Sequence, residues 1–86
     1  MNKIVQSLKD VDIRKLTYPI CTIYKNPSDF PDNYVVRLFD LNRPTNIIII
    51  RNSVTDCRAD LMAAGFTTHF MRDFRDDPCI VESWMQ

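Results

Sequence analysis

Four consecutive isoleucines, residues 47–50, constrain this chain more than any other feature of its sequence. Successive side chains of a strand point to opposite faces, so such a run places apolar groups on both faces. A strand of this kind needs a central position in a sheet or a covered second face. The run is also the longest unbroken apolar stretch, far short of the roughly 20 residues that cross a bilayer. The sequence therefore predicts a buried strand over residues 46–51 and no membrane partner.

Length and composition predict one globular domain over residues 1–86, because a second domain would lack a core. Hydrophobic residues make up 45% of the chain and acidic and basic residues balance at 11 each, which excludes disorder. Zero net charge removes a general attraction to nucleic acid and leaves self-association, such as a homodimer, open.

Cysteine usage predicts a reducing, cytoplasmic setting. Cys21, Cys57 and Cys79 are odd in number and widely spaced, which argues against both a disulfide framework and a zinc site. Three reduced, buried thiols are the expected state. The first ten residues lack the continuous apolar stretch of a signal peptide. We expect no metal and no cofactor.

Four further strands are predicted from β-branched and aromatic runs over residues 18–25, 34–41, 67–72 and 79–84. Pro19 belongs at a strand start or a sheet edge, because it cannot donate a ladder hydrogen bond. Turn-forming residues over 26–33 and 42–45 separate the first three strands and predict antiparallel hairpins. In the strand over 34–41, even-numbered residues share one face, and Val35, Arg37, Phe39 and Leu41 share the other.

One helix is predicted over residues 54–64. Ser53 and Asp56 have the spacing of a capping box, and Gly65 suits the left-handed position after a helix. The fold class is therefore α+β, with two layers and a mainly antiparallel sheet of four to five strands covered on one face by this helix. For residues 1–16 the apolar spacing from Ile4 to Val11 favours a short N-terminal helix, and an edge strand from Ile4 is the alternative.

The motifs of common enzyme classes are missing. A single glycine cannot form a phosphate-binding loop. A symmetric hairpin centred on Arg75 and Asp76 places the one histidine, His69, opposite Glu82 rather than Cys79, which disfavours a Cys–His nucleophile. A Cys–His enzyme remains the minor alternative, and it predicts that Cys79 is the fastest cysteine to alkylate. The leading expectation is a protein that is not an enzyme.

Protein binding is the function that the sequence favours. The loop over 26–33 carries Phe30 between two prolines, and the turn over 73–78 carries Phe74 among charged residues. Aromatic and arginine side chains are the usual interface hot spots. The expected protein-binding residues are Asp29, Phe30, Arg72, Phe74, Arg75, Asp76 and Asp77.

A small RNA- or DNA-binding protein is the alternative. Arginines suit phosphates and base edges, and strand aromatics could stack bases. The candidate arginines are Arg37, Arg43, Arg51 and Arg72, and the strand aromatics are Tyr24, Tyr34, Phe39, Phe70 and Trp84.

Three segments of the sequence can be compared with known proteins as one pattern. They are Tyr18-Pro19-x-x-x-x-Tyr24-x-Asn26-Pro27-x-Asp29-Phe30-Pro31, Val36-Arg37-Leu38-Phe39-Asp40 and Asp76-Asp77-Pro78-x-Ile80-Val81-Glu82-x-Trp84. The pattern resembles short uncharacterised proteins of Gram-positive bacteria, their phages and mobile elements, which have no established activity to carry over. The resemblance implies a bacterial or phage origin. Because small phage proteins often block a host enzyme, it also implies an inhibitor of a host protein such as a defence nuclease.

Overall fold

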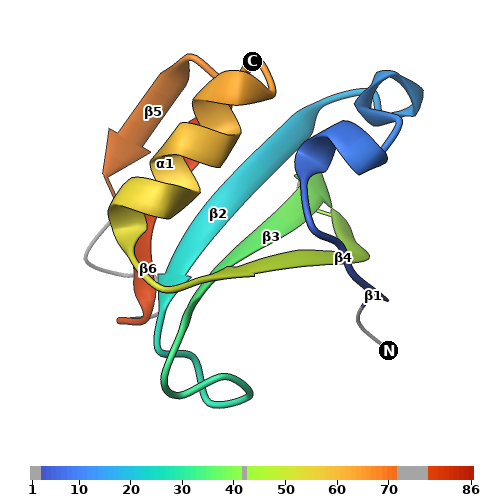
Figure 1. Cartoon of the computed structure of the whole chain (residues 1–86). Coiled ribbons are helices and arrows are strands. Elements are labelled where there is room, and N and C mark those ends of the chain that lie inside the picture. Colours follow the sequence, from blue (N-terminus) through green and yellow to red (C-terminus); the bar gives the residue numbers. More distant parts are fainter. Residues whose placement is uncertain (1–2, 42, 72–77) are drawn as a thin grey trace.

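The protein is built on one six-stranded, mixed, open sheet, seen in a computed structural model that describes residues 3–41, 43–71 and 78–86 (Figure 1). The strand order is β1-β4-β3-β2-β6-β5. β1 runs parallel to β4, and every other neighbouring pair is antiparallel. The strands are β1 (Lys3–Ile4), β2 (Pro19–Lys25), β3 (Tyr34–Asp40), β4 (Arg43–Arg51), β5 (Thr68–Met71) and β6 (Ile80–Met85).

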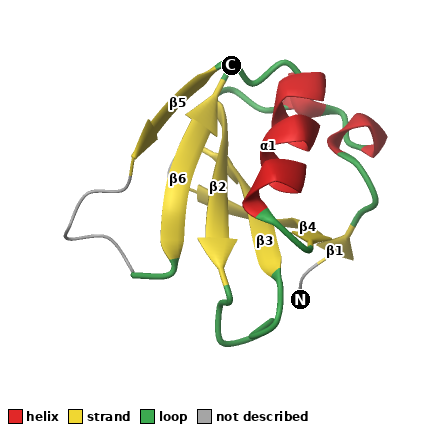
Figure 2. Ribbon diagram, turned by 60° about the vertical axis from the view of Figure 1, so that its left-hand side comes forward, coloured by secondary structure: helices red, strands yellow, loops and turns green. Residues whose placement is uncertain are grey.

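One α-helix, α1 (Val54–Ala63), covers one face of this sheet within the described residues (Figure 2). It lies over β2, β3 and β4. Its buried residues, Cys57 and Leu61, pack on Cys21, Ile23 and other residues of one core cluster. The α+β prediction is therefore confirmed in outline. The sheet has one strand more than expected, because β1 forms where a helix was favoured.

Both ends of α1 follow the predicted signals. The Ser53 hydroxyl accepts a hydrogen bond from the Asp56 amide at 3.2 Å, which satisfies one of the free donors of the first turn. At the other end Gly65 has φ +91°, and its amide donates to the Met62 carbonyl. The Phe66 amide donates to the Leu61 carbonyl, which completes a Schellman motif and turns Phe66 into the core.

The N-terminal helix favoured by the sequence is wrong, and the structure has the alternative, an edge strand at Ile4. β1 is an edge strand, continued by a hydrogen bond from the Val5 amide to the Ile48 carbonyl at 3.0 Å. Two single 3-10 turns follow, η1 (Leu8–Asp10) and η2 (Ile13–Lys15). Leu8 is buried and Val11 packs against the core, so the apolar spacing was real. An isolated helix of this length is unstable, and the Ser7 hydroxyl binds the Lys9 amide, which starts a short turn instead.

The predicted pairing of the last two strands is also wrong. His69 lies opposite Trp84, and Met71 lies opposite Glu82. The register differs by two residues from the symmetric hairpin, so each side chain keeps its face. The observed register lets His69 stack on the Trp84 ring, with 4.6 Å between centroids, while Glu82 takes its charged partner from α1.

Candidate functional site

The candidate site is the face of the sheet that α1 leaves uncovered, which we call the open face. Strand pairing defines its central row, since opposed residues share a face. In β3 the odd-numbered residues Val35, Arg37 and Phe39 lie on the open face, while Val36 and Leu38 pack toward the helix, as the alternation predicted. From edge to edge the central row is Ile4, Ile48, Arg37, Thr22, Ser83 and Phe70.

Apolar side chains occupy both ends of this row. Ile4 is 54% exposed at the β1 edge and Phe70 is 48% exposed at the β5 edge. In the neighbouring row, Met85 of β6 is 36% exposed and lies opposite Ile20. The open face therefore presents large apolar groups to solvent at positions where a sheet with no partner would carry polar ones.

Polar side chains with no net charge lie at the centre of the open face. Arg37 forms an ion pair with Asp29, with 2.5 Å between Nη2 and Oδ2. The same guanidinium lies 5.4 Å from the centre of the Tyr24 ring, within the range of a cation–π contact. The Thr22 and Ser83 hydroxyls are 3.1 Å apart in a hydrogen bond. Arg37 and Ser83 are half-buried and Thr22 is buried, so the centre presents a few hydrogen-bonding groups and no uncompensated charge.

The loop between β2 and β3 holds Asp29 beside Arg37. The Asn26 amide donates to the Asn33 carbonyl at 2.9 Å and closes the loop, and the Phe30 amide donates to the Pro27 carbonyl at 2.9 Å. Pro27 is buried and Phe30 is half-buried, so this loop is a packed part of the surface. Among the described residues, a hollow of about 580 Å³ is lined by Tyr24, Pro27, Ser28, Asp29, Arg37 and Cys79.

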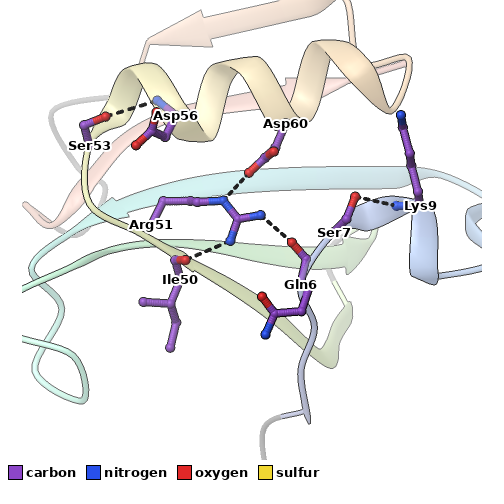
Figure 3. Close-up of polar contacts among 8 residues, drawn as sticks. All are labelled: Gln6, Ser7, Lys9, Ile50, Arg51, Ser53, Asp56 and Asp60. Atoms are coloured by element: carbon purple, nitrogen blue, oxygen red, sulfur yellow. Dashed lines mark hydrogen bonds and ion pairs between the residues drawn. The ribbon is translucent and has the colours of Figure 1, made fainter.

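Arg51 belongs to the opposite side of the sheet (Figure 3). Its Nε donates to Asp60 of α1, and Nη1 donates to the Ile50 carbonyl at 2.9 Å. Nη2 donates to the Gln6 carbonyl. One side chain therefore ties the end of β4 to the helix and to the N-terminal segment. Arg51 and Arg37 do not share a surface.

Glu82 of β6 forms a second link to α1, through Arg58. Its side chain is fully buried, and Oε1 accepts hydrogen bonds from Arg58 Nη2 at 2.6 Å and Nε at 3.1 Å. Oε2 accepts from Trp84 Nε1 at 2.7 Å. The hydrogen bonds from Arg58 to Glu82 raise the pKa of Arg58, and the attraction between the two charges adds to this effect. Arg58 and Asp60 thus fix the helix to β6 and β4.

The buried thiols are poor nucleophiles. Burial raises the pKa of Cys21 to about 12. Burial, followed by the charge of Asp60, raises the pKa of Cys57 to about 11. Both thiols stay protonated near neutral pH, and only thiolates react. Trp84 lies between Cys21 and His69 in the same row of residues, so these two side chains are not neighbours in the sheet.

The structure brings only some of the predicted binding residues together. Asp29, expected to bind protein, pairs with Arg37, expected to bind nucleic acid. Phe30 is half-buried in the same loop as Asp29. Arg43 is exposed at the start of β4, opposite Asp40. Arg72, Phe74, Arg75, Asp76 and Asp77 lie outside the described residues. The sequence analysis missed Thr22, Ser83, Ile4 and Met85, which the strand alternation could have placed once the covered face was known.

The fold and the site define a small α+β protein with an open sheet face of mixed apolar and neutral polar character. Comparisons with protein-family models, with curated proteins and with solved structures find no match to this chain. Within residues 3–41, 43–71 and 78–86, no helix has the length and apolar character needed to cross a membrane. In the same ranges no three His, Cys, Asp or Glu side chains are grouped so that they could hold a metal ion.

Proposed function

We propose that this protein is a small protein-binding module that is not an enzyme and that contacts its partner through the open face. The observation that carries the proposal is the pairing of exposed apolar groups, Ile4 and Met85, with a charge-neutral centre at Arg37 and Asp29. Protein interfaces have the same composition, with aromatic, methionine and arginine side chains and few unpaired charges at the centre.

The same centre favours protein over nucleic acid as the partner. Binding to phosphates needs cations whose charge is not already neutralised. Arg37 is paired with Asp29, and Arg51 is bonded to Asp60 on the helix side. An RNA- or DNA-binding protein that uses Arg43 and Arg72 remains the second candidate, because Arg43 is exposed.

The proposed partner is a folded host protein with an uncharged, apolar patch, for instance a defence nuclease that this chain blocks. The family resemblance of residues 18–84 supports this partner class. The open face supports its chemistry, because desolvating a neutral apolar surface costs less than desolvating unpaired charges.

Affinity capture from a bacterial lysate, followed by titration with each purified captured protein, tests the proposal. Ile4→Asp and Arg37→Glu change the open face away from β5, and Met62→Asp changes an equally exposed position on α1. We expect the two open-face variants to bind a captured protein at least about tenfold more weakly, the loss of about 1.4 kcal/mol expected for a hot-spot residue, with no change for Met62→Asp. Equal binding by all three variants would contradict the assignment of the open face.

A second arm measures binding to single-stranded RNA and DNA at low and high salt. Protein binding predicts no shift of the oligonucleotides. Tight, salt-sensitive binding that Arg43→Ala weakens would instead support the nucleic-acid candidate, because neutralised phosphates release counterions.

A further inference from the structure

The two edges of the sheet differ in how they are protected. β5 is the last strand on its side and pairs only with β6, while α1 lies over β2, β3 and β4 (Figure 2). All four residues of β5 are exposed, with Phe70 at 48% and Met71 at 72% on opposite faces. The backbone groups on the outer side of β5 therefore face solvent in the part of the chain that the structure describes.

Natural edge strands usually carry a charge, a proline or a bulge that prevents pairing with another chain. The opposite edge has such protection, because β1 is only two residues long and begins with Lys3. β5 has none of it. Its sequence is Thr-His-Phe-Met, and its register with β6 is unbroken.

We infer that β5 is a self-association edge, at which two copies of this chain pair antiparallel and extend the sheet across a twofold axis. A second copy fits this edge because an antiparallel strand pair about a twofold axis is self-complementary. The zero net charge of the chain adds no repulsion between copies. Such a dimer joins the two open faces into one surface, with Phe70 side chains close to the axis.

The geometry restricts the pairing to a few registers. A twofold axis perpendicular to the sheet keeps both helices on one side. At that axis, one residue of β5 lies opposite the same residue of the second copy. In the four-residue strand the registers that pair most residues place either His69 opposite His69 or Phe70 opposite Phe70. The ladder is short, so the dimer belongs to the weak class of interfaces, with a dissociation constant on the order of 0.1 mM.

Sedimentation equilibrium of the full chain from about 10 µM to about 1 mM tests the association. We expect a monomer–dimer equilibrium that Phe70→Lys with Met71→Lys weakens at least tenfold, because edge lysines oppose strand pairing. Met62→Lys, at a similarly exposed position on α1, should leave it unchanged. A monomer at every concentration, or a dimer that resists both lysines, would overturn the inference.

Disulfide trapping locates the contact without adding charged side chains to the edge. In a Cys79→Ser background, His69→Cys or Phe70→Cys should form a covalent dimer under mild oxidation, because residues paired at the axis bring their Cα atoms within disulfide reach. Met62→Cys is the control. Equal trapping at Met62→Cys would contradict pairing at β5.

The two proposals can fail separately. The dimer test uses the purified chain alone, and the variants expected to change association lie in β5. The partner test changes Ile4 and Arg37, which lie on other strands.

Discussion

Glu82 brings a carboxylate into the protein interior, where both of its oxygens have hydrogen-bond partners. Arg58 bonds to one oxygen and Trp84 to the other. A charge that is buried without its partner is far more costly than one that is paired. The stability of the contact between α1 and β6 therefore depends on Arg58.

Arg58→Met keeps the aliphatic stem of the side chain and removes its charge. We expect the free energy of unfolding to fall by about 2–3 kcal/mol, somewhat below the usual cost of breaking a buried ion pair because Arg58 is partly exposed. Urea denaturation measures the change. Arg14→Met is the control, since Arg14 is 93% exposed in its pair with Asp12, and it should change stability by less than about 0.5 kcal/mol.

Cys21 makes stability depend on pH in the alkaline range. Its thiol ionises near pH 9.0 in the unfolded chain but only at about 12 in the folded protein. Its contribution is fully present below pH 9.0 and is lost as the pH rises toward 12, at about 1.4 kcal/mol per pH unit. Cys21→Ala should flatten the loss of stability between about pH 9.5 and 11 relative to the native chain.

Urea midpoints at several pH values measure that slope. Ile49→Val, another change in the buried core, should lower stability and leave the slope unaltered. The same slope in Cys21→Ala and the native chain would show that the thiol ionises alike in both states.

Alkylation rates do not separate a Cys–His enzyme from a binding protein in this structure. Cys79 is half-buried, while Cys21 and Cys57 are buried. Faster reaction of Cys79 follows from accessibility alone.

At the scale of elements, local chemistry predicted most of the fold. Strand propensity located β2, β3 and β6 within one or two residues, and Ser53 and Gly65 marked the ends of α1. Alternation divided β3 into its two faces. These signals lie within a few neighbouring residues, so a single sequence contains them.

The features that the sequence left undecided or did not predict depend on distant residues. β1 forms because β4 offers it an edge, and Arg51 fixes the segment that follows by binding Gln6. The register of β5 depends on the Trp84 ring and on Arg58, which lies 24 residues from Glu82 in the chain. The open face could not be identified from the strands alone, because the covered face depends on where α1 packs.

Arg51→Lys tests the junction of β4, α1 and the N-terminal segment. Lysine keeps the charge but cannot reach Asp60, Ile50 and Gln6 together with a planar fork of donors. We expect a loss of about 1–2 kcal/mol, measured by urea denaturation, and faster amide exchange at Val5, whose hydrogen bond holds β1 to β4. Unchanged exchange at Val5 would mean that Arg51 does not secure the segment.

At the scale of the whole molecule, β6 joins the sheet into one unit. It lies between β2 and β5, although it comes last in the chain. The sheet is therefore incomplete until the C-terminal residues are present, and the core lacks Trp84 without them.

Deletion of residues 80–86 should abolish folding, because it removes β6 and leaves β5 without a neighbour. Deletion of residues 1–4 removes only the short edge strand β1 and should leave a folded protein. Circular dichroism and dispersion of amide NMR signals measure both outcomes. A folded protein without residues 80–86 would be inconsistent with this strand order.

The division of the sheet into a helix-covered face and an open face is the basis of the proposed binding function. Amide chemical-shift mapping of the full chain, on addition of a purified captured protein, tests it most directly. We predict shifts at Thr22, Arg37 and Ser83 in the central row of the open face, with little change at Met62 on α1. Shifts confined to α1, with the open-face amides unmoved, would contradict it.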